Sequence, residues 1–287
     1  MKSFRTLLVG LLLAPCTLGC TIVADLDSYV SADDIGCDMQ LNVVLFAPHI
    51  EDPVYFQAVT REDPPVLRAM AIIDNLVVPD RSFFMPNAIG EGPHALNFWA
   101  DDNDDGLVQT SPIRGTDHSW RSEDVCAFDS NCEADGLNCF SHVSPFVEID
   151  NPIEEGNTLD LTLTGLPATI GFVEAHLVEH DADLNLRRVV GLYRRDDTGG
   201  GPTFSLELRG LALPTKRYSV DVLVDLNGDA QIEPSTEVFT VTESAGSAYV
   251  NPITLDVTTS DPRGDLPPER GLDEDHPAEL VSPLPTP

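Results

Sequence analysis

Basic residues are scarce in this chain, and their scarcity excludes one large class of partners. Among 287 residues, Lys and Arg number 16 and Asp and Glu number 48, so the formal net charge is -32. Proteins that bind nucleic acids place clusters of Lys and Arg against the phosphate backbone. We therefore expect no nucleic-acid partner. Hydrophobic residues make up 42% of the chain, which is too many for a wholly disordered acidic polymer.

The hydrophobic run at the N-terminus is too short to remain in a bilayer as a helix. Lys2 and Arg5 precede the apolar residues 7–14, whereas a membrane-spanning helix needs about 20 apolar residues. This pattern is typical of a secretory signal peptide, here residues 1–19. The signal ends in Thr17-Leu18-Gly19-Cys20, which resembles the bacterial lipobox.

The lipobox resemblance implies that Cys20 becomes a lipid-modified N-terminus and attaches the exported chain to a membrane. Thr21 stands where some bacteria place the Asp that retains a lipoprotein in the inner membrane, which favours the outer membrane of the cell envelope. The alternative is ordinary cleavage nearby, with Cys20 as a free thiol. Residues 20–40 are acidic and weakly periodic, so we interpret them as a tether between the lipid and the first domain.

Four cysteines remain once the signal and the lipid site are set aside: Cys37, Cys126, Cys132 and Cys139. In an oxidising compartment these four predict two disulfides, with three possible connectivities. The sequence around them has no Cys-x2-Cys pair and no histidine at ligand spacing, which disfavours a zinc–thiolate site.

Helical periodicity is also lacking, apart from one turn near residues 66–72, and short alternating segments take its place. In residues 219–224, Val220, Val222 and Val224 share one side, while Ser219 and Asp221 face the other. An alternation of period two, with Gly, Pro or Asp at intervals of about 8–12 residues, is typical of a β-sandwich. The sequence therefore predicts an all-β fold.

The middle of the chain contains an internal similarity. Residues 94–106 align without a gap with residues 218–230, and each segment is an alternating strand that leads into Asp-x-Asn-x-Asp. Upstream, residues 41–46 resemble residues 159–164. We predict two tandem immunoglobulin-like β-sandwich domains, the first with a Cys-rich insertion, followed by a disordered Pro-rich and acidic tail. The predicted boundaries are 41–150, 151–258 and 259–287.

The strongest chemical signal is the acidic loop after each aligned strand. In the first loop an oxygen-bearing side chain recurs at every second position: Asp101, Asn103 and Asp105. Ca²⁺ prefers six to eight oxygen ligands, and alternate residues of a tight turn direct such oxygens inward. Gly106 supplies a permissive backbone, the Leu107 carbonyl fits the seventh position, and we suggest that Asp117 folds back to complete the site.

The second loop has the same spacing. Its oxygen-bearing residues are Asp225, Asn227 and Asp229, with Gln231 at the position of Leu107 and Glu233 and Glu237 as later carboxylates. Ala230 replaces the glycine, which departs from the pattern. Both loops resemble those of EF-hand, dockerin and thrombospondin type 3 proteins, and the resemblance implies Ca²⁺ at the weak extracellular affinity of about 10⁻⁴–10⁻³ M. The alternative is a pair of hairpin turns, for which Asn-Gly is a favoured dipeptide.

The chain as a whole resembles bacterial cell-envelope lipoproteins with tandem immunoglobulin-like or transthyretin-like β-sandwiches, which carry such loops followed by Asp-His-x-Trp. The resemblance implies this architecture and a role for a cation, but no particular activity. Our first hypothesis is a non-enzymatic adhesion or scaffolding protein, stabilised by Ca²⁺, whose partner is a cell-surface protein or glycan. One alternative is a carbohydrate-binding module with an exposed Trp99 or Trp120. Another is a hydrolase based on carboxylates, although no His-Glu-x-x-His, His-x-His or Gly-x-Ser-x-Gly motif is present.

Overall fold

The computed structural model describes ten stretches of the chain: residues 37–75, 77, 81–90, 93–108, 117–123, 139–142, 146–181, 186–196, 201–242 and 252–265. The predicted signal peptide, the lipid site Cys20, and Cys126 and Cys132 lie outside these residues. Among the described residues, no helix has the length and apolar character needed to cross a membrane.

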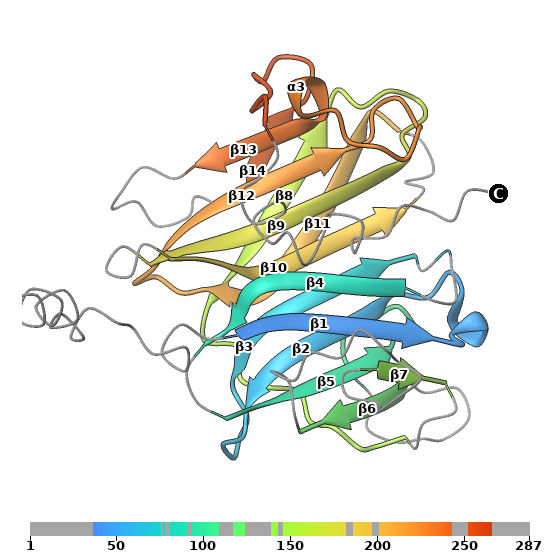
Figure 1. Ribbon diagram of the computed structural model, residues 1–287, viewed down its shortest axis with the longest axis vertical. Helices are drawn as coiled ribbons and strands as arrows, with labels where there is room; N and C mark the ends of the chain where they lie inside the picture. The colour runs from blue at the N-terminus through green and yellow to red at the C-terminus, as the bar shows by residue number, and fades with distance from the viewer. Residues whose placement is uncertain are drawn as a thin grey trace, which may run out of the picture.

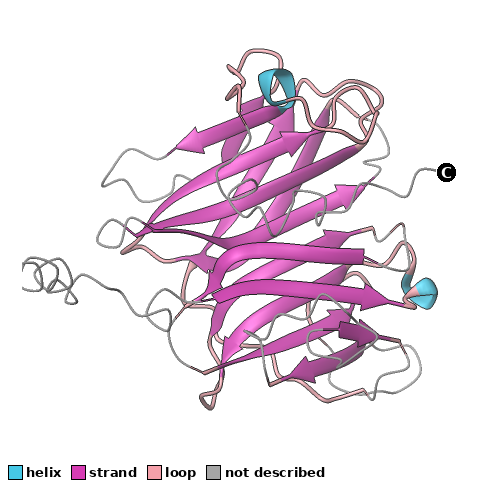
Figure 2. Cartoon of the chain, in the orientation of Figure 1, coloured by secondary structure: helices cyan, strands magenta, loops and turns pink. Residues whose placement is uncertain are grey.

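The first half of the described chain consists of strands, with one turn of 3-10 helix (Figure 2). In order, these elements are β1 (Cys37–Val44), η2 (Ala47–His49), β2 (Val54–Thr60), β3 (Leu67–Asp74), β4 (Arg81–Ile89), β5 (His94–Ala100), β6 (His118–Ser122) and β7 (Cys139–Ser141).

The second half has the same number of strands and one short helix. Its elements are β8 (Asn157–Thr164), β9 (Phe172–Asp181), β10 (Leu186–Asp196), β11 (Thr203–Ala212), β12 (Arg217–Val224), α3 (Pro234–Glu237), β13 (Val238–Thr242) and β14 (Ile253–Asp256). The predicted all-β fold class is confirmed. The helical turn expected near residues 66–72 is wrong, because this segment forms β3.

One eight-stranded sheet runs through both halves in the order β13-β12-β9-β10-β3-β2-β5-β6. Two three-stranded sheets, β4-β1-β7 and β11-β8-β14, complete the fold. The strand order of the second half therefore matches that of the first, with β8 in the place of β1 and β14 in the place of β7. The halves join where β3 and β10 pair in parallel, with Met70 opposite Gly191.

The two small sheets cover opposite faces of the large sheet, which makes a sandwich in each half. On β3, Ala71 and Ile73 belong to the core beneath β1 and β4, whereas Met70 and Ile72 belong to the core beneath β8 and β11. In Figure 1, β1 and β4 lie in front of the large sheet and β8 and β11 lie behind it. A two-fold axis along the strands between β3 and β10 accounts for both the parallel pairing and the opposite faces.

The alternating strands place their apolar side chains in these two cores, as hydrophobic burial requires. Fully buried residues of the first core include Phe56, Phe98 and Trp120, and those of the second include Leu161, Val220 and Val222. The two predicted sandwiches thus share a central sheet.

The described ends of the folded region extend beyond the predicted boundaries. β1 begins at Cys37, so the last residues of the predicted tether belong to the first strand. At the other end, residues 259–265 pack on the second half, where the Arg263 N–H donates to the Val238 carbonyl at 2.7 Å and the Gly264 N–H donates to the Pro234 carbonyl at 3.0 Å. The remaining predicted tail, 266–287, lies outside the described residues.

The backbone positions of Cys37 and Cys139 narrow the predicted disulfide connectivities. Cys139 pairs with Asn42 on the neighbouring parallel strand, five residues further along β1 than Cys37. At about 3.3 Å per residue, the two cysteine Cα atoms lie about 16 Å apart, whereas a disulfide requires less than about 7 Å. A Cys37–Cys139 disulfide is therefore incompatible with this fold.

Candidate functional site

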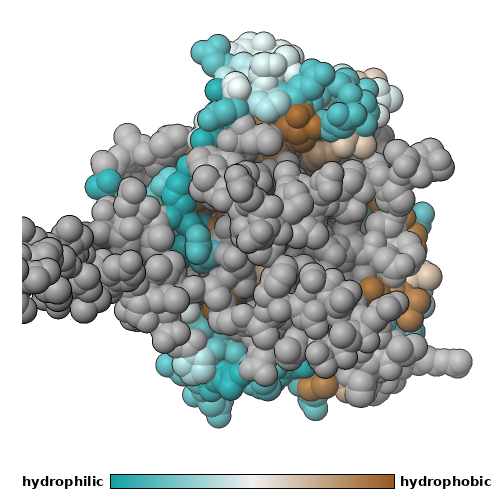
Figure 3. All heavy atoms as spheres, in the orientation of Figure 1, coloured by the Kyte–Doolittle hydropathy of each residue, from teal (hydrophilic) through white to brown (hydrophobic). Residues whose placement is uncertain are grey.

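The two acidic loops lie at the same end of the large sheet. Asp101 directly follows β5, and Asp225 directly follows β12. The pairings across the sheet give β5, β3, β10 and β12 one common direction. Both loops therefore lie at the C-terminal ends of these four strands, on the right-hand side of Figure 1. The surface over α3 and the loop after β12 is largely hydrophilic (Figure 3).

The first loop is organised around the carboxylate of Asp101, which is 1% exposed. Asp101 Oδ1 accepts the Asp105 N–H at 3.3 Å, and its Oδ2 accepts the Gly106 N–H at 2.7 Å. Asn103 Oδ1 also accepts the Asp105 N–H at 3.3 Å, and Asp105 Oδ1 accepts the Leu107 N–H at 2.9 Å. The three predicted side-chain ligands thus turn toward one backbone turn.

The second loop repeats these hydrogen bonds. Asp225 Oδ1 and Oδ2 accept the N–H groups of Asp229 and Ala230 at 3.2 and 2.8 Å. Asn227 Oδ1 accepts the Asp229 N–H at 2.8 Å, and Asp229 Oδ1 accepts the Gln231 N–H at 2.9 Å. A hydrogen bond between side chains also recurs. The Asn103 amide donates to Asp105 Oδ2 at 3.1 Å, and the Asn227 amide donates to Asp229 Oδ2 at 3.2 Å.

Of the later carboxylates predicted for the second loop, Glu237 lies against it. Glu237 ends α3 and is 1% exposed. Its Oε1 accepts the Leu226 N–H at 2.9 Å and its Oε2 accepts the Glu233 N–H at 2.7 Å. The side chain of Glu233 is exposed. Glu237 is therefore the better placed of the two.

Asp117 holds a comparable place in the first half, because it directly precedes β6 and is buried. A metal site would bring the carboxylate oxygens of Asp117, Asp101 and Asp105 within a few ångströms of one another. Among the described residues, these three do not form a group with ligand atoms within 4.8 Å of one another. The part of Asp117 in the first loop stays a prediction.

Burial raises the pKa of two loop carboxylates. Desolvation is the largest cause for Asp101, where hydrogen bonds from the Gly106 and Asp105 amides act in the opposite direction. Desolvation also raises the pKa of Glu237, and the negative charge of Asp225 adds to it. A neighbouring cation would stabilise both carboxylates in the charged form.

A polar cleft of ≈ 250 Å³ adjoins the first loop, between the large sheet and β11. Its lining includes Asp74, Asp104, Glu207 and Arg209. Asp74 accepts hydrogen bonds from the Tyr193 hydroxyl and the Arg195 guanidinium, and Glu207 accepts one from Arg209 at 3.0 Å. Asp74 and Glu207 thus form structural ion pairs and hydrogen bonds with arginine and tyrosine.

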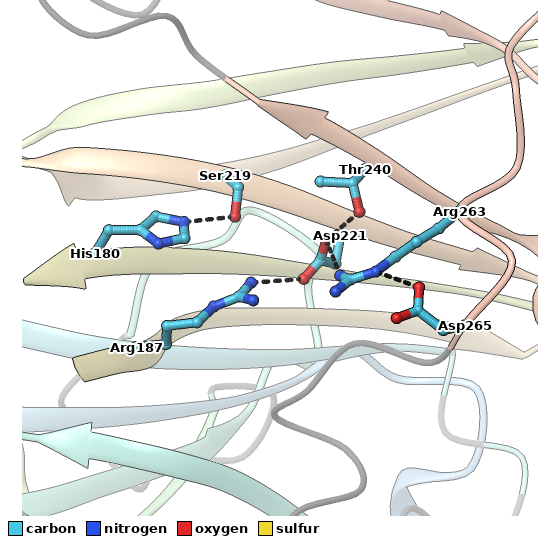
Figure 4. Close-up of polar contacts among 7 residues, drawn as sticks. All are labelled: His180, Arg187, Ser219, Asp221, Thr240, Arg263 and Asp265. Atoms are coloured by element: carbon cyan, nitrogen blue, oxygen red, sulfur yellow. Dashed lines mark hydrogen bonds and ion pairs between the residues drawn. The ribbon is translucent and has the colours of Figure 1, made fainter. Parts of the chain in front are cut away.

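A second group of polar residues lies on β9, β10, β12 and β13 and in the segment after β14 (Figure 4). Asp221 is fully buried and accepts hydrogen bonds from Thr240, Arg187 and Arg263. His180 and Ser219 lie 2.8 Å apart beside it. Because the Asp221 carboxylate is directed to the two guanidinium groups and Thr240, the arrangement is that of a buried ion cluster.

The carbohydrate-binding alternative required an exposed indole, and both tryptophans are 1% exposed. Trp99 stacks on Tyr55 at a centroid distance of 4.7 Å, and Trp120 stacks on Phe98 at 4.8 Å. Neither ring offers a face to a sugar, so this alternative lacks the observation on which it depended.

Sequence reasoning missed a group of three histidines that lies beside the first loop. His49, His118 and His142 come from segments far apart in the chain, and no short spacing unites them. Asp102, the second residue of the loop, lies 3.1 Å from His49. Only the strand pairing brings these residues together.

No protein-family model and no curated protein matches the sequence. Among solved structures, the chain shows a likeness to the fimbrial anchor protein Mfa2 from Porphyromonas gingivalis, with 12% sequence identity over 72% of this chain and 82% of that chain. The TM-score is 0.20. A score this low does not indicate a shared fold.

Proposed function

We propose that this chain is an exported, lipid-anchored protein of the bacterial cell envelope, without enzymatic activity, in which calcium ions brace two acidic loops. Its role is adhesion or scaffolding, with a cell-surface protein or glycan as partner. The signal-like N-terminus with Cys20 supports export and attachment to the outer membrane. The observation that carries the calcium assignment is the repetition of one hydrogen-bond pattern around Asp101 and Asp225.

The repetition matters because the same turn of alternating oxygens follows the corresponding strand of the sheet in each half. We infer from it that the halves are copies of one unit. Each aspartate in the pattern uses only part of its acceptor capacity on backbone N–H groups, since a carboxylate has about four lone-pair sites. The remaining lone pairs, the amide oxygens and a backbone carbonyl supply the hard oxygen ligands that Ca²⁺ prefers.

Calorimetric titration of the mature protein with CaCl₂ tests this proposal. We expect two ions per chain, at affinities of about 10⁻⁴–10⁻³ M, and a higher Tm at millimolar Ca²⁺ because binding stabilises the folded state. Absence of both heat and a change in Tm would refute the calcium assignment.

Single-site variants assign the ions to the loops. Asp105→Asn and Asp229→Asn each alter one exposed carboxylate at matching positions, and each is expected to remove one ion. Asp104→Asn is the matched control, because Asp104 is an exposed neighbour that lies outside the alternating pattern. The control is expected to bind both ions.

Growth with labelled palmitate tests the anchor separately. We expect label on the wild-type chain and none on Cys20→Ser. An unlabelled wild-type chain would contradict lipid attachment and leave the calcium assignment untouched.

A further inference from the structure

Three histidines from distant parts of the chain meet beside the first acidic loop. His49 ends η2, His118 begins β6 and His142 follows β7. One ligand nitrogen of each lies within 4.8 Å of the other two. The strand pairing explains why two of these histidines lie close together. β1 and β7 run parallel and end side by side, with η2 shortly after β1 and His142 directly after β7.

The surroundings of His49 fix the orientation of its ring. Its Nδ1 lies 3.1 Å from Asp52 Oδ2 and 3.1 Å from Asp102 Oδ1. Because both carboxylates face Nδ1, the other ring nitrogen, Nε2, is directed to His118. A histidine that donates one N–H to a carboxylate while its other nitrogen binds a metal is a recurring arrangement at metal sites.

The other two histidines complete a converging set. His49 Nε2 and His118 Nδ1 form a hydrogen bond at 3.0 Å, and this separation is close to the distance of about 3.3 Å between two nitrogens bound at 2.0–2.1 Å to one tetrahedral metal. His142 Nε2 is buried and has no hydrogen-bond partner within the described structure. A buried polar nitrogen without a partner is costly and calls for an unseen ligand.

Aromatic side chains surround the three rings. Phe146 stacks on His118 at a centroid distance of 4.4 Å, and Phe46 lies 5.9 Å from His49. Trp120 packs edge-on against His49 at 6.5 Å. Such packing restricts the imidazoles and reduces their access to water, which strengthens a bound cation's interaction with its ligands.

We propose that His49, His118 and His142 form a binding site for a divalent transition metal of the zinc type, positioned by Asp52 and Asp102. Imidazole nitrogens suit Zn²⁺, Cu²⁺ and Ni²⁺, whereas Ca²⁺ and Mg²⁺ prefer oxygen ligands. Three histidines leave the fourth position of a tetrahedral zinc site open to water or to a group from a partner.

This site is distinct from the calcium loops although it borders one of them. Asp101 directs its carboxylate into the loop, toward the Asp105 and Gly106 amides, while the adjacent Asp102 is directed to His49. The zinc-type site and the oxygen-lined loop therefore use different residues and different ligand chemistry. An experiment can therefore refute one of these two proposed sites without refuting the other.

Titration of the oxidised mature protein with ZnCl₂ and CoCl₂ tests the site. We expect one Zn²⁺ per chain and, with Co²⁺, visible absorption of a nitrogen-bound tetrahedral ion without the thiolate charge-transfer band that cysteine ligands produce. His118→Gln and His142→Gln are each expected to weaken Zn²⁺ binding by at least about 100-fold, because even an outer-shell partner is worth 10–100-fold. Asp52→Asn, which alters a positioning residue, is expected to weaken it by about 10-fold or more.

His180→Gln is the matched control, because His180 bonds to Ser219 in the other half of the chain, and we expect it to bind Zn²⁺ as the wild type does. His142 is half-buried, whereas His49 is buried. The His142 variant is therefore expected to stay folded, so that its loss of Zn²⁺ binding reports on the site. A wild type that binds no Zn²⁺, or His118 and His142 variants that bind it as tightly as the wild type, would overturn the proposal. Calcium titration of the same variants shows whether the loops are affected.

Discussion

Gly106 and Ala230 occupy the same place in the two acidic loops, and both have a left-handed backbone, with φ of 71° and 63°. Their N–H groups donate to the buried carboxylates of Asp101 and Asp225 at 2.7 and 2.8 Å. An alanine in this conformation is strained, whereas a glycine is not. The loop therefore keeps its shape in the second half at a conformational cost.

Exchanging these two residues is expected to have opposite effects on stability. Ala230→Gly relieves the strain and raises the free energy of unfolding by about 0.5–1 kcal/mol, after the greater entropy of glycine in the unfolded chain is subtracted. Gly106→Ala lowers it by about 1 kcal/mol. Denaturant unfolding measures both changes, and effects of the same sign would contradict the shared loop geometry.

Gly171 makes room for the second loop. A Cβ atom at Gly171 would lie 1.9 Å from Asp225 Oδ2, so Gly171→Ala must displace that carboxylate. We expect a loss of about 1–3 kcal/mol in unfolding free energy, as for other overpacked sites, together with loss of Ca²⁺ from the second loop alone. Gly201→Ala is the control, because its Cβ would meet only the Thr203 carbonyl at 3.7 Å. Equal behaviour of the two variants would contradict this role.

A buried arginine neutralises two carboxylates in the second half. Arg194 lies 2.8 Å from Glu174 and 3.0 Å from Asp196, and all three side chains are at most 4% exposed. Arg194→Met removes the guanidinium from two buried acids, of which Glu174 keeps its contact with His176 at 2.6 Å, and the loss is expected to be about 3–5 kcal/mol.

The matched control for Arg194 is Arg68→Met, which breaks the surface pair with Glu155 at 3.0 Å. Exposed pairs contribute at most about 1 kcal/mol. Denaturant unfolding of the two variants measures the loss of unfolding free energy in each. Equal losses would contradict a stabilising role for the buried Arg194 that exceeds that of a surface arginine.

The stability of the protein is expected to depend on pH through His180. Burial lowers the pKa of His180, the positive charge of Arg187 lowers it further, and Asp221 opposes the change. Arg217 faces it from β12 and Arg187 from β10. Below the unfolded pKa of about 6.5 the unfolded chain takes up a proton that the folded chain resists, so this contribution to stability is lost as the pH falls through that value.

His180→Gln removes this titration. Denaturant unfolding at several pH values between about 5 and 7.5, the range in which histidine titrates, is expected to show a shallower loss of stability in the variant than in the wild type. Identical pH dependence in both proteins would refute the assignment.

The local pattern of the sequence predicted the strands well because each strand buries one alternating face. Val220, Val222 and Val224 of β12 all lie in the second core, as their period of two requires. The pattern does not reveal which strands pair across the halves. Met70 and Gly191 are neighbours in the sheet although more than a hundred residues separate them, and both faces of β3 are apolar, so its central place has no local signal.

The sites divide in the same way. The side-chain oxygens of the acidic loops are spaced within a few residues, so sequence reasoning finds them. The ligands of the histidine site are brought together by β1, β6 and β7, and nothing near His49 in the sequence points to His118 or His142. The carbohydrate-binding alternative required an exposed indole, whereas the Trp99 ring stacks on Tyr55 from the neighbouring strand.

A crystal structure grown with Ca²⁺ would show whether the two halves carry the same calcium loop at equivalent strand ends. We expect one ion in each loop, bound by oxygens of Asp101, Asn103 and Asp105 in the first and of Asp225, Asn227 and Asp229 in the second. Loops without ions, with these side chains turned to bulk solvent in dissimilar surroundings, would contradict this expectation.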